Sequence, residues 1–442
     1  MKDSGIEWIG MIPNEWDTSR VKYLATEKDS LFIDGDWIES DVIVESGIRY
    51  LTTGNVGPGY YKEQGSGYIS EETFKKLNCL KVLPNDLMIS RLNEPIGRAC
   101  IVPNTEPYYV VAVDNVILRP DSKYDKKYIM YCMNTDGYAE AGKEAARGAT
   151  MQRVSRTLLG SFFVPIAPLS EQKLITDFLD EKVKQINDIL SDLNKQVEVL
   201  NMYRKSLITE AVTKGLNPDA KMKSSGVNWI GDIPKGWHIK PIKYFADFYN
   251  GDRGENYPLN SELVNEGIPF INAGDIVNGI ISYENMSYIT KEKYKLMGGV
   301  KLKDNDMVYC LRGSIGKNAL VHIDEGTVNS CMVGIRCKDY NPQYFYYCMN
   351  SFIEENWRNI LSSGSVQAQM GAETIKLFKF PVPKITEQQE IVNYLDQKCA
   401  EIDSVIADKQ KQIEKIEKYK KSLIYEYVTG KKRVRGGLID KK

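Results

Sequence analysis

One stretch of the chain, Ser170–Lys214, sets its architecture. It reads SEQKLITDFLDEKVKQINDILSDLNKQVEVLNMYRKSLITEAVTK, and its apolar residues recur at alternating steps of four and three residues, the pattern of a coiled-coil seam. The seam positions are Leu179, Val183, Ile186, Leu190, Leu193, Val197, Leu200 and Leu207, with Arg204 at the one polar position. Ser170 is a candidate N-cap, and Gly215 followed by Pro218 is a stop signal. A helix of this length spans about 60 Å and cannot bury its apolar stripe alone, so it requires a partner.

A second stretch, Thr386–Gly430, repeats this pattern near the end of the chain. Its seam positions are Leu395, Cys399, Ile402, Ile406, Ile413, Ile416 and Leu423, with Lys409 and Lys420 as polar interruptions. Thr386 and Gln389 have the spacing of a capping box. Either helix alone could be a solvated helix on a larger core. Two such helices in equivalent places favour an intramolecular coiled coil.

The chain is a tandem duplication. SGIEWIGMIPNEW at Ser4–Trp16 returns as SGVNWIGDIPKGW at Ser225–Trp237, PNDLMISRLNEPIGRACIV matches DNDMVYCLRGSIGKNALV, and YIMYCMN matches YFYYCMN. The predicted plan is a first globular domain at 1–165, a long helix at 166–214, a second globular domain at 215–385, a second long helix at 386–430 and a basic tail at 431–442. Such a chain has approximate two-fold symmetry. The connector at 215–225 is too short to run back along a rod of about 60 Å, which predicts antiparallel helices.

Each globular half combines short β-rich runs, separated by Gly, Asn and Pro turns, with helical patterns at 126–134, 136–147 and 342–361. We therefore expect an α/β or α+β domain with a curved, mostly antiparallel sheet. The Asn-Asp pairs that end at Asp86 and Asp306 are interpreted as turns.

The amino-acid composition restricts the possible classes of protein only loosely. The 442 residues carry a net charge of −1, which neither indicates nor excludes a nucleic-acid binder. The absence of a long apolar run or a signal-peptide core predicts a cytoplasmic protein. The eight cysteines form no C-x-x-C pair, so we expect reduced thiols rather than a zinc site or disulfides.

The sequence offers no convincing enzyme motif. NPQY at 341–344 is close to the N-P-P-Y loop of amino-group methyltransferases, but Asn followed by Pro is also a plain helix start. GSIGKN at 313–318 lacks the first glycine and the Ser or Thr of a P-loop, so it is interpreted as a turn. With only two histidines, His-based acid/base chemistry is not expected. We predict no catalytic residue, no metal site and no cofactor site in this chain.

The duplicated order of elements resembles the specificity subunit of type I restriction-modification systems. The resemblance rests on two copies of W-I-G-x-I-P-x-x-W and two copies of P-x-(L/I)-(S/T)-E-Q opening a long heptad helix, and it covers essentially the whole chain. It implies two target-recognition domains that each read half of a bipartite, asymmetric site in double-stranded DNA. It further implies two modification subunits that carry S-adenosylmethionine and methylate adenine N6, and restriction subunits that cleave DNA.

In this interpretation, the DNA-binding candidates are basic and amide side chains able to pair with base edges or phosphate. In the first half they are Arg91, Asn93, Arg98, Lys143, Arg147, Thr150, Gln152 and Arg153. In the second half they are Arg253, Arg312, Ser314, Lys317, Asn318, Arg358, Ser365, Gln367 and Gln369. Arg91 and Arg312 are the preferred candidates because each follows a strand into a Gly-containing loop. The alternative is a solvent-exposed loop that caps the preceding helix.

Partner binding is expected on the outer helix faces and at Trp8, Trp16, Trp229 and Trp237. Alternatively, these tryptophans only pack the start of each half onto the helices. Two other functional classes stay open at this point: a scaffold whose globular halves bind proteins, and an enzyme acting alone. Salt-dependent binding of duplex DNA separates the scaffold from a DNA-binding subunit.

Overall fold

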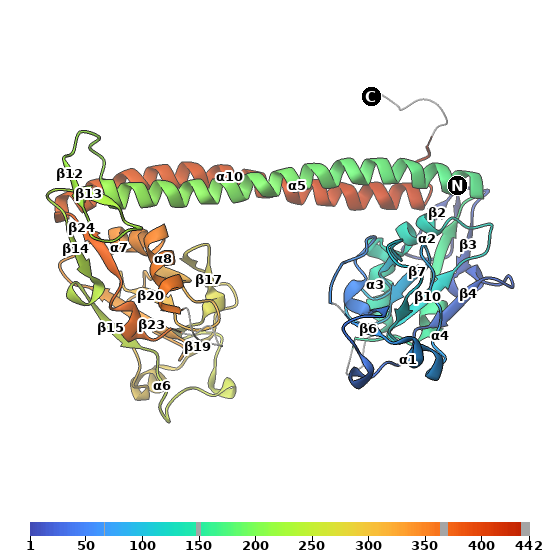
Figure 1. Ribbon diagram of the computed structural model, residues 1–442, viewed down its shortest axis with the longest axis horizontal. Helices are drawn as coiled ribbons and strands as arrows, with labels where there is room; N and C mark the ends of the chain where they lie inside the picture. Colours follow the sequence, from blue (N-terminus) through green and yellow to red (C-terminus); the bar gives the residue numbers. More distant parts are fainter. Residues whose placement is uncertain (66, 147–151, 363–369, 435–442) are drawn as a thin grey trace. The chain divides into compact units, whose positions relative to one another are not determined.

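The computed structural model describes residues 1–65, 67–146, 152–362 and 370–434 (Figure 1). The chain divides into two compact units: unit 1 is Met1–Leu193 with Lys411–Lys442, and unit 2 is Asn194–Gln410. Each unit therefore contains one copy of the duplicated module together with a segment from each of the two long helices.

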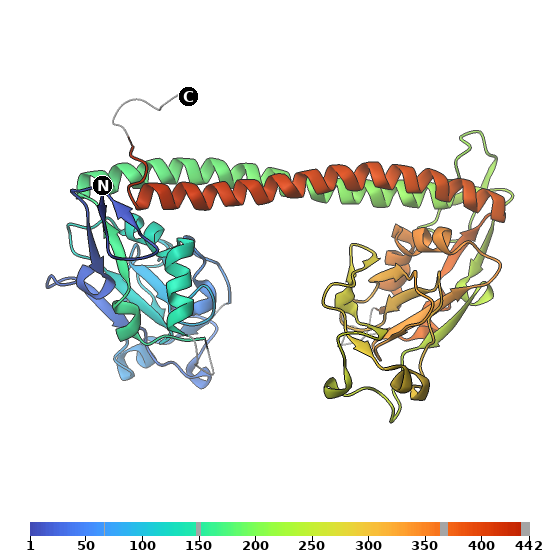
Figure 2. The ribbon, with the colours of Figure 1, turned by 180° about the vertical axis from the view of Figure 1, so that it is seen from behind.

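The long helices are α5, Leu169–Lys214, and α10, Ile385–Val428. They run antiparallel within each unit (Figure 2). As residue numbers increase along α5, the residue numbers of the contact partners on α10 decrease. In unit 1 Phe178 packs against Tyr427 with ring centroids 4.5 Å apart, and the Lys420 ammonium donates to Asn187 Oδ1 at 2.7 Å. In unit 2 the pairs are Lys409 with Gln196 at 2.6 Å and Arg204 with Asp403 at 3.0 Å. The antiparallel prediction is confirmed.

The predicted seam side chains lie at the helix interface, since each of them is buried or half-buried while most of their neighbours are exposed. Arg204, Lys409 and Lys420 occupy polar seam positions, and each reaches a polar side chain of the opposite helix. Burial lowers the pKa of Lys420. Each cationic group thus has a hydrogen-bond or ion-pair partner, which offsets the cost of placing a charge in an apolar seam.

The predicted caps at Ser170 and Thr386 are wrong by two residues, because the helices begin at Leu169 and Ile385, which makes Pro168 and Lys384 the N-cap residues. The glutamine of the S/T-E-Q motif secures the helix start instead. Gln172 Nε2 donates to the Ala167 carbonyl at 2.7 Å, and Gln388 Nε2 donates to the Pro383 carbonyl at 3.0 Å. A side chain from the first turn thus binds the carbonyl of a residue that precedes the helix and joins the helix start to the incoming chain.

Unit 1 is built on a four-stranded antiparallel sheet of order β4-β10-β7-β8, with a small sheet β6-β5-β9 beside it and helices α2 and α3 packed nearby (Figure 1). The strands are β1 (Lys2–Asp3), β2 (Met11–Ile12), β3 (Asp17–Arg20), β4 (Leu31–Asp34), β5 (Ile48–Leu51), β6 (Tyr68–Ile69), β7 (Leu87–Ser90), β8 (Ala99–Ile101), β9 (Val110–Val111), β10 (Asn115–Arg119) and β11 (Phe163–Ile166). The helices are α1 (Glu71–Lys76), α2 (Lys126–Met133), α3 (Asp136–Ala145) and α4 (Arg156–Gly160).

Unit 2 repeats this plan with the four-stranded sheet β15-β23-β20-β21 and the small sheet β19-β16-β22. Its strands are β12 (Met222–Ser224), β13 (Asp232–Pro234), β14 (His238–Pro241), β15 (Ala246–Asn250), β16 (Ile268–Ile271), β17 (Ile276–Val277), β18 (Ile280–Ile281), β19 (Tyr288–Ile289), β20 (Met307–Cys310), β21 (Asn318–Leu320), β22 (Thr327–Val328), β23 (Met332–Cys337) and β24 (Lys379–Val382). Its helices are α6 (Lys291–Leu296), α7 (Pro342–Met349), α8 (Phe352–Ser362) and α9 (Ala372–Ile375). The predicted α+β class with mostly antiparallel sheets is confirmed; β5 with β9 and β16 with β22 are parallel pairs.

Two of the motif tryptophans join each module to its long helix. Trp16 Nε1 donates to Glu171 Oε2 at 2.9 Å, and Trp237 Nε1 donates to Glu387 Oε2 at the same distance. Both indoles are buried. The last tryptophan of each W-I-G-x-I-P-x-x-W motif is therefore the partner of the glutamate in the S/T-E-Q motif, and the packing interpretation fits these two rings.

The other two motif tryptophans are half-buried. Trp8 packs edge-on against Tyr138 with centroids 6.1 Å apart, and Trp229 packs against Trp357 at 4.8 Å. Each of these two rings keeps part of its surface open to solvent.

Candidate nucleic-acid interface

In each unit, loops gather at one edge of the four-stranded sheet. Because neighbouring strands are antiparallel, β4 and β7 end where β10 and β8 begin, and β15 and β20 end where β23 and β21 begin. We call residues 91–98, 112–114 and 152–156 the loop edge of unit 1, and residues 251–254, 311–317 and 329–331 the loop edge of unit 2. Most of the predicted DNA-binding residues that the structure describes lie on these two edges.

Arg91 lies inside the loop edge of unit 1 and is only 5 % exposed. Its guanidinium donates to the Val154 carbonyl at 3.0 Å and the Val113 carbonyl at 2.6 Å, and it pairs with Asp34 Oδ1 at 3.1 Å. Burial lowers the pKa of this arginine. Arg91 thus ties two loops to the end of β4.

Arg98, like Arg91, donates hydrogen bonds to backbone carbonyls of the surrounding loops. It donates from Nε to the Val56 carbonyl at 2.8 Å, from Nη2 to the Thr53 carbonyl at 3.1 Å, and from Nη1 to the carbonyls of Leu92 and Asn93 at 3.0 and 2.9 Å. One guanidinium therefore satisfies a ring of loop carbonyls that would otherwise lack donors. Arg98 fixes the shape of residues 92–95.

The exposed donors of unit 1 are Asn93, Gln152, Arg153 and Lys143. Three of them face carboxylates: Arg153 Nε lies 2.9 Å from Asp114 Oδ1, while Gln152 Nε2 and Lys143 Nζ lie 3.3 and 3.8 Å from Glu94 Oε1. The two pairs with Glu94 are exposed and weak, so a stronger acceptor can replace that carboxylate, whereas Asp114 is half-buried. Arg147 and Thr150 lie outside the described residues.

The loop edge of unit 2 is more open. The side chains of Arg312 and Ser314 are exposed and make no hydrogen bond or ion pair with any residue that the structure describes. Arg253 Nε donates to the Ser330 carbonyl at 3.2 Å, and Lys317 Nζ donates to the Ala273 carbonyl at 2.6 Å. Ser365, Gln367 and Gln369 lie outside the described residues.

Backbone register explains why Arg91 is buried while Arg312 is exposed. Arg91 N donates to the Asp114 carbonyl, and the residue in the same position of unit 2 is Leu311, whose N donates to the Cys331 carbonyl; both distances are 2.8 Å. Arg312 therefore corresponds to Leu92, one residue further on. Side chains alternate sides along an extended chain, so this single step moves the guanidinium from the interior to the surface.

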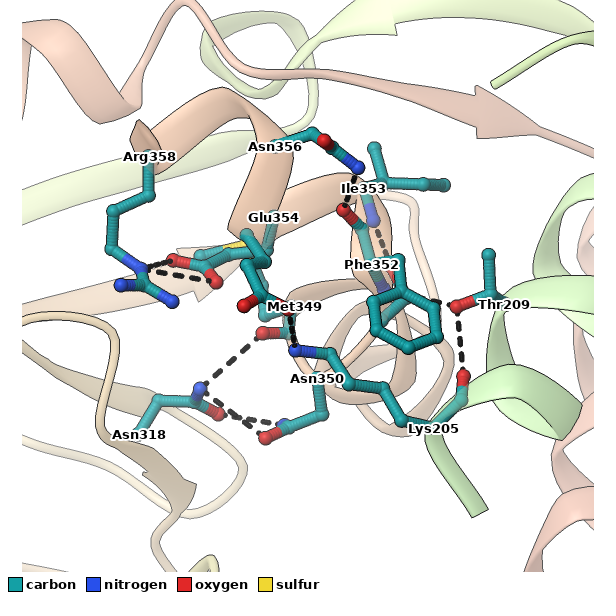
Figure 3. A network of polar contacts seen from close by, with 12 residues as sticks. Lys205, Thr209, Asn318, Met349, Asn350, Phe352, Ile353, Glu354, Asn356 and Arg358 are labelled. Atoms are coloured by element: carbon teal, nitrogen blue, oxygen red, sulfur yellow. Dashed lines mark hydrogen bonds and ion pairs between the residues drawn. The ribbon is translucent and has the colours of Figure 1, made fainter. Parts of the chain in front are cut away.

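Two further candidates lie at the interior side of unit 2 (Figure 3). Asn318 is 3 % exposed, and its Oδ1 accepts a hydrogen bond from Asn350 Nδ2 at 2.9 Å. Arg358 Nε donates to Glu354 Oε1 at 3.1 Å. The carboxylates that hold these loops, such as Glu354, Asp34 and Asp114, were not predicted, because nothing local in the sequence marks a carboxylate that pairs across the fold.

The basic tail begins on the surface of unit 1. Lys431 Nζ donates to the Ile9 carbonyl at 2.7 Å, and Arg433 pairs with Glu15 and, at 3.3 Å, with Glu171. Residues 435–442 lie outside the described residues. Among the residues that the structure describes, no three His, Cys, Asp or Glu side chains are grouped to hold a metal ion, and no helix is long and apolar enough to cross a membrane.

The chain is a duplicated module whose loop edges carry arginine and amide side chains, and the comparisons identify the module as a DNA specificity domain. The family model of the type I restriction modification DNA specificity domain matches residues 13–199 and 234–417. The chain belongs to this family: it is a sequence-specific DNA-recognition subunit of a type I restriction-modification system and is not itself an enzyme.

Individual relatives span much of the chain. The MjaVIII specificity subunit of Methanocaldococcus jannaschii is 24 % identical over 437 residues, which are 96 % of this chain and 94 % of that protein. The EcoBI specificity subunit of Escherichia coli is 24 % identical over 294 residues, 64 % of this chain and 61 % of that protein. A solved chain from work on complex assembly and conformational transition of the type I R-M system matches the fold with a TM-score of 0.65, at 12 % identity over 97 % of this chain and all of that one.

Proposed function

We propose that each unit reads one half of a bipartite site in double-stranded DNA. The observation that carries this proposal is that both copies of the specificity module build the same loop edge with different side chains. Arg312 of unit 2 stands where unit 1 has Leu92, and Leu311 stands where unit 1 has Arg91. Because the two edges offer different donors, the two half-sites differ in sequence and the whole site is asymmetric.

The exposed donors are the residues that we assign to DNA. In unit 1 they are Asn93, Gln152 and Arg153, and in unit 2 they are Arg253, Arg312 and Ser314. Arginine pairs with the O6 and N7 atoms of guanine, and Asn or Gln pairs with adenine. The two lysines, Lys143 and Lys317, are suited to phosphate. Arg147, Thr150, Ser365, Gln367 and Gln369 stay candidates on sequence alone.

The interior residues have a different part in this proposal. Arg91, Arg98 and Asn318 contact loop carbonyls and neighbouring side chains, so they shape the loop edges rather than touch the bases. Their replacement changes recognition through the loop conformation.

The partners that we propose are two modification subunits, which carry S-adenosylmethionine and methylate adenine N6, and restriction subunits, which cleave DNA. Support for a protein partner on α5 comes from three exposed apolar side chains in unit 2: Val199 and Met202, each 64 % exposed, and Tyr203, 57 % exposed. Residues three and four apart share one helix face, so they form a patch suited to a protein surface. Trp8 and Trp229 are further docking candidates, whereas the buried Trp16 and Trp237 belong to packing.

The test is a map of adenine methylation in cells that contain the modification subunit, with and without this chain. A bipartite motif that disappears with the chain supports the proposal and reports both half-sites and the spacer. Unchanged methylation, with the modification subunit present and active, contradicts it. Duplex binding by the assembled complex should also weaken steeply as salt rises, because bound phosphates release counterions.

A further inference from the structure

Unit 2 contains a buried charge network at the back of its loop edge. Glu354, on α8, is 4 % exposed, and its Oε1 accepts a hydrogen bond from the Tyr309 hydroxyl at 2.6 Å. Arg358, one helical turn further on, donates its Nε to Glu354 Oε1 and Oε2 at 3.1 and 3.5 Å (Figure 3). A buried carboxylate is costly unless it is paired, so this network fixes all three side chains.

The network touches the loop that bears Arg312 and Ser314. Gly316 has a φ of +90°, and a Cβ atom at this position would lie 2.8 Å from Arg358 Nε and 3.3 Å from Glu354 Oε1. The guanidinium therefore packs directly against the turn at 316. The position of this turn depends on how Glu354 holds Arg358.

The module does not need this network in order to fold. In unit 1, the shared Y-x-x-Y-C-M-N segments place Tyr138 at the position of Glu354 and Gly142 at the position of Arg358. The register of β7 with β8 and of β20 with β21 places Ile89 at the position of Tyr309. Unit 1 fills the same space with Ile89 and Tyr138, which are fully buried. The charged network of Tyr309, Glu354 and Arg358 therefore occurs in unit 2 and has no counterpart at these positions of unit 1.

Arg358 retains donors for a ligand. Only its Nε is bonded to the residues that the structure describes, and its side chain is 28 % exposed. An arginine held at Nε presents its two Nη atoms in a fixed orientation, so it loses little conformational freedom when it binds an acceptor pair.

We propose that Glu354 is a positioning residue for DNA recognition, which orients Arg358 and the turn at Gly316 so that the Arg358 Nη atoms donate to an acceptor of the half-site read by unit 2. The inference rests on the proposed function and deepens it. The acceptor is a pair of neighbouring hydrogen-bond acceptor atoms. Two oxygens of a DNA phosphate provide such a pair, and so do the O6 and N7 atoms of guanine.

The test compares Glu354→Gln, Arg358→Ala and Arg358→Lys in the complex with the modification subunits. The matched control is Glu355→Gln, because the carboxylate of Glu355 pairs with Lys205 of α5 at 2.5 Å instead of the loop. Readouts are the affinity for duplex DNA, its salt dependence and the methylation motif. The half-site read by unit 1 is an internal control in every molecule.

We expect Arg358→Ala to weaken binding to the specific site about tenfold or more, and Glu354→Gln to produce part of the same effect, with the double variant no worse than Arg358→Ala. If the acceptor is phosphate, Arg358→Lys restores much of the affinity, and Arg358→Ala weakens binding to all sequences and reduces the salt slope by about one unit. If the acceptor is guanine, Arg358→Lys does not restore the preference, and one position of the second half-site relaxes.

Two results would overturn the inference: variants that bind and methylate like the native chain, or a loss at both half-sites that follows a lowered melting temperature. Failure of the proposed function itself gives a different result, since then no bipartite motif depends on this chain at all.

Discussion

Replacing Arg91 by alanine tests whether this arginine holds the loop edge of unit 1 from inside. The side chain is 5 % exposed, donates two hydrogen bonds to carbonyls and pairs with Asp34. Each hydrogen bond to a charged group contributes about 1.5 to 3 kcal/mol, and breaking a buried ion pair costs about 3 to 5 kcal/mol. Because Asp34 keeps a second partner, Arg156, at 3.5 Å, we expect Arg91→Ala to cost unit 1 about 3 to 4 kcal/mol of unfolding free energy.

For a unit of this size, such a loss lowers the melting temperature by roughly 10 °C. Calorimetry of the purified subunit measures this change, with Arg312→Ala as the matched control, which should leave the melting temperature unaltered because its side chain is exposed and unpaired among the described residues. At a permissive temperature, methylation mapping of Arg91→Ala should show weaker occupancy of the first half-site with the same preferred bases. An unchanged melting temperature together with relaxed base preference would refute this reasoning, since Arg91 would then be reading DNA directly.

Three further outcomes are expected. Arg312→Ala should relax one position of the second half-site by about 1 to 3 kcal/mol in a methylation map, and an unaltered motif would remove Arg312 from base recognition. Asp121 accepts hydrogen bonds from Thr26 and Ser30. Desolvation raises the pKa of Asp121, but the hydrogen bonds to its carboxylate outweigh desolvation and lower the pKa to about 2. Because this folded pKa is below the unfolded one, its stabilisation is complete above about pH 4 and is lost as pH falls towards 2. Acid unfolding followed by circular dichroism should therefore be shallower in Asp121→Asn, and an identical acid limb would contradict this. Gly430→Ala should destabilise unit 1 by about 1 kcal/mol or more, because φ is +69° and a Cβ would lie 2.4 Å from Pro13 Cδ. Gly5→Ala, with φ +71° and no atom within 4 Å, is its control in thermal unfolding, and equal losses would show that the contact is irrelevant.

The sequence was sufficient to predict the architecture, because period and repetition are local signals. Heptad spacing identifies both long helices, and the short connector at 215–225 requires them to be antiparallel. The helix starts were harder to predict. A hydroxyl before a helical pattern normally indicates a cap, but here Ser170 and Thr386 lie inside the first turns of helices that begin at Leu169 and Ile385.

The candidate site was only partly predictable. Arg91 and Arg312 look equivalent in sequence, since each follows a strand into a Gly-containing loop. The register differs by one residue, and that residue decides which guanidinium reaches solvent. Neither propensity nor composition encodes this register; it is fixed by hydrogen bonds from Arg91 to Asp114 and from Leu311 to Cys331, which join segments distant in the chain.

The packing of the last part of α10 against the first module has a consequence for the biosynthesis of unit 1. The Tyr128 hydroxyl donates to the Val428 carbonyl at 2.9 Å, and Leu423 and Val428 belong to the same buried cluster as Trp16. Unit 2, at Asn194–Gln410, is complete once residue 410 has left the ribosome, whereas unit 1 must wait for residues 411 onward. The second module can therefore finish folding before the first, and during translation the nascent first module lacks the apolar contacts that α10 makes with it in the folded chain. A premature stop codon within the segment that encodes α10 would thus leave unfinished the module that was synthesised first.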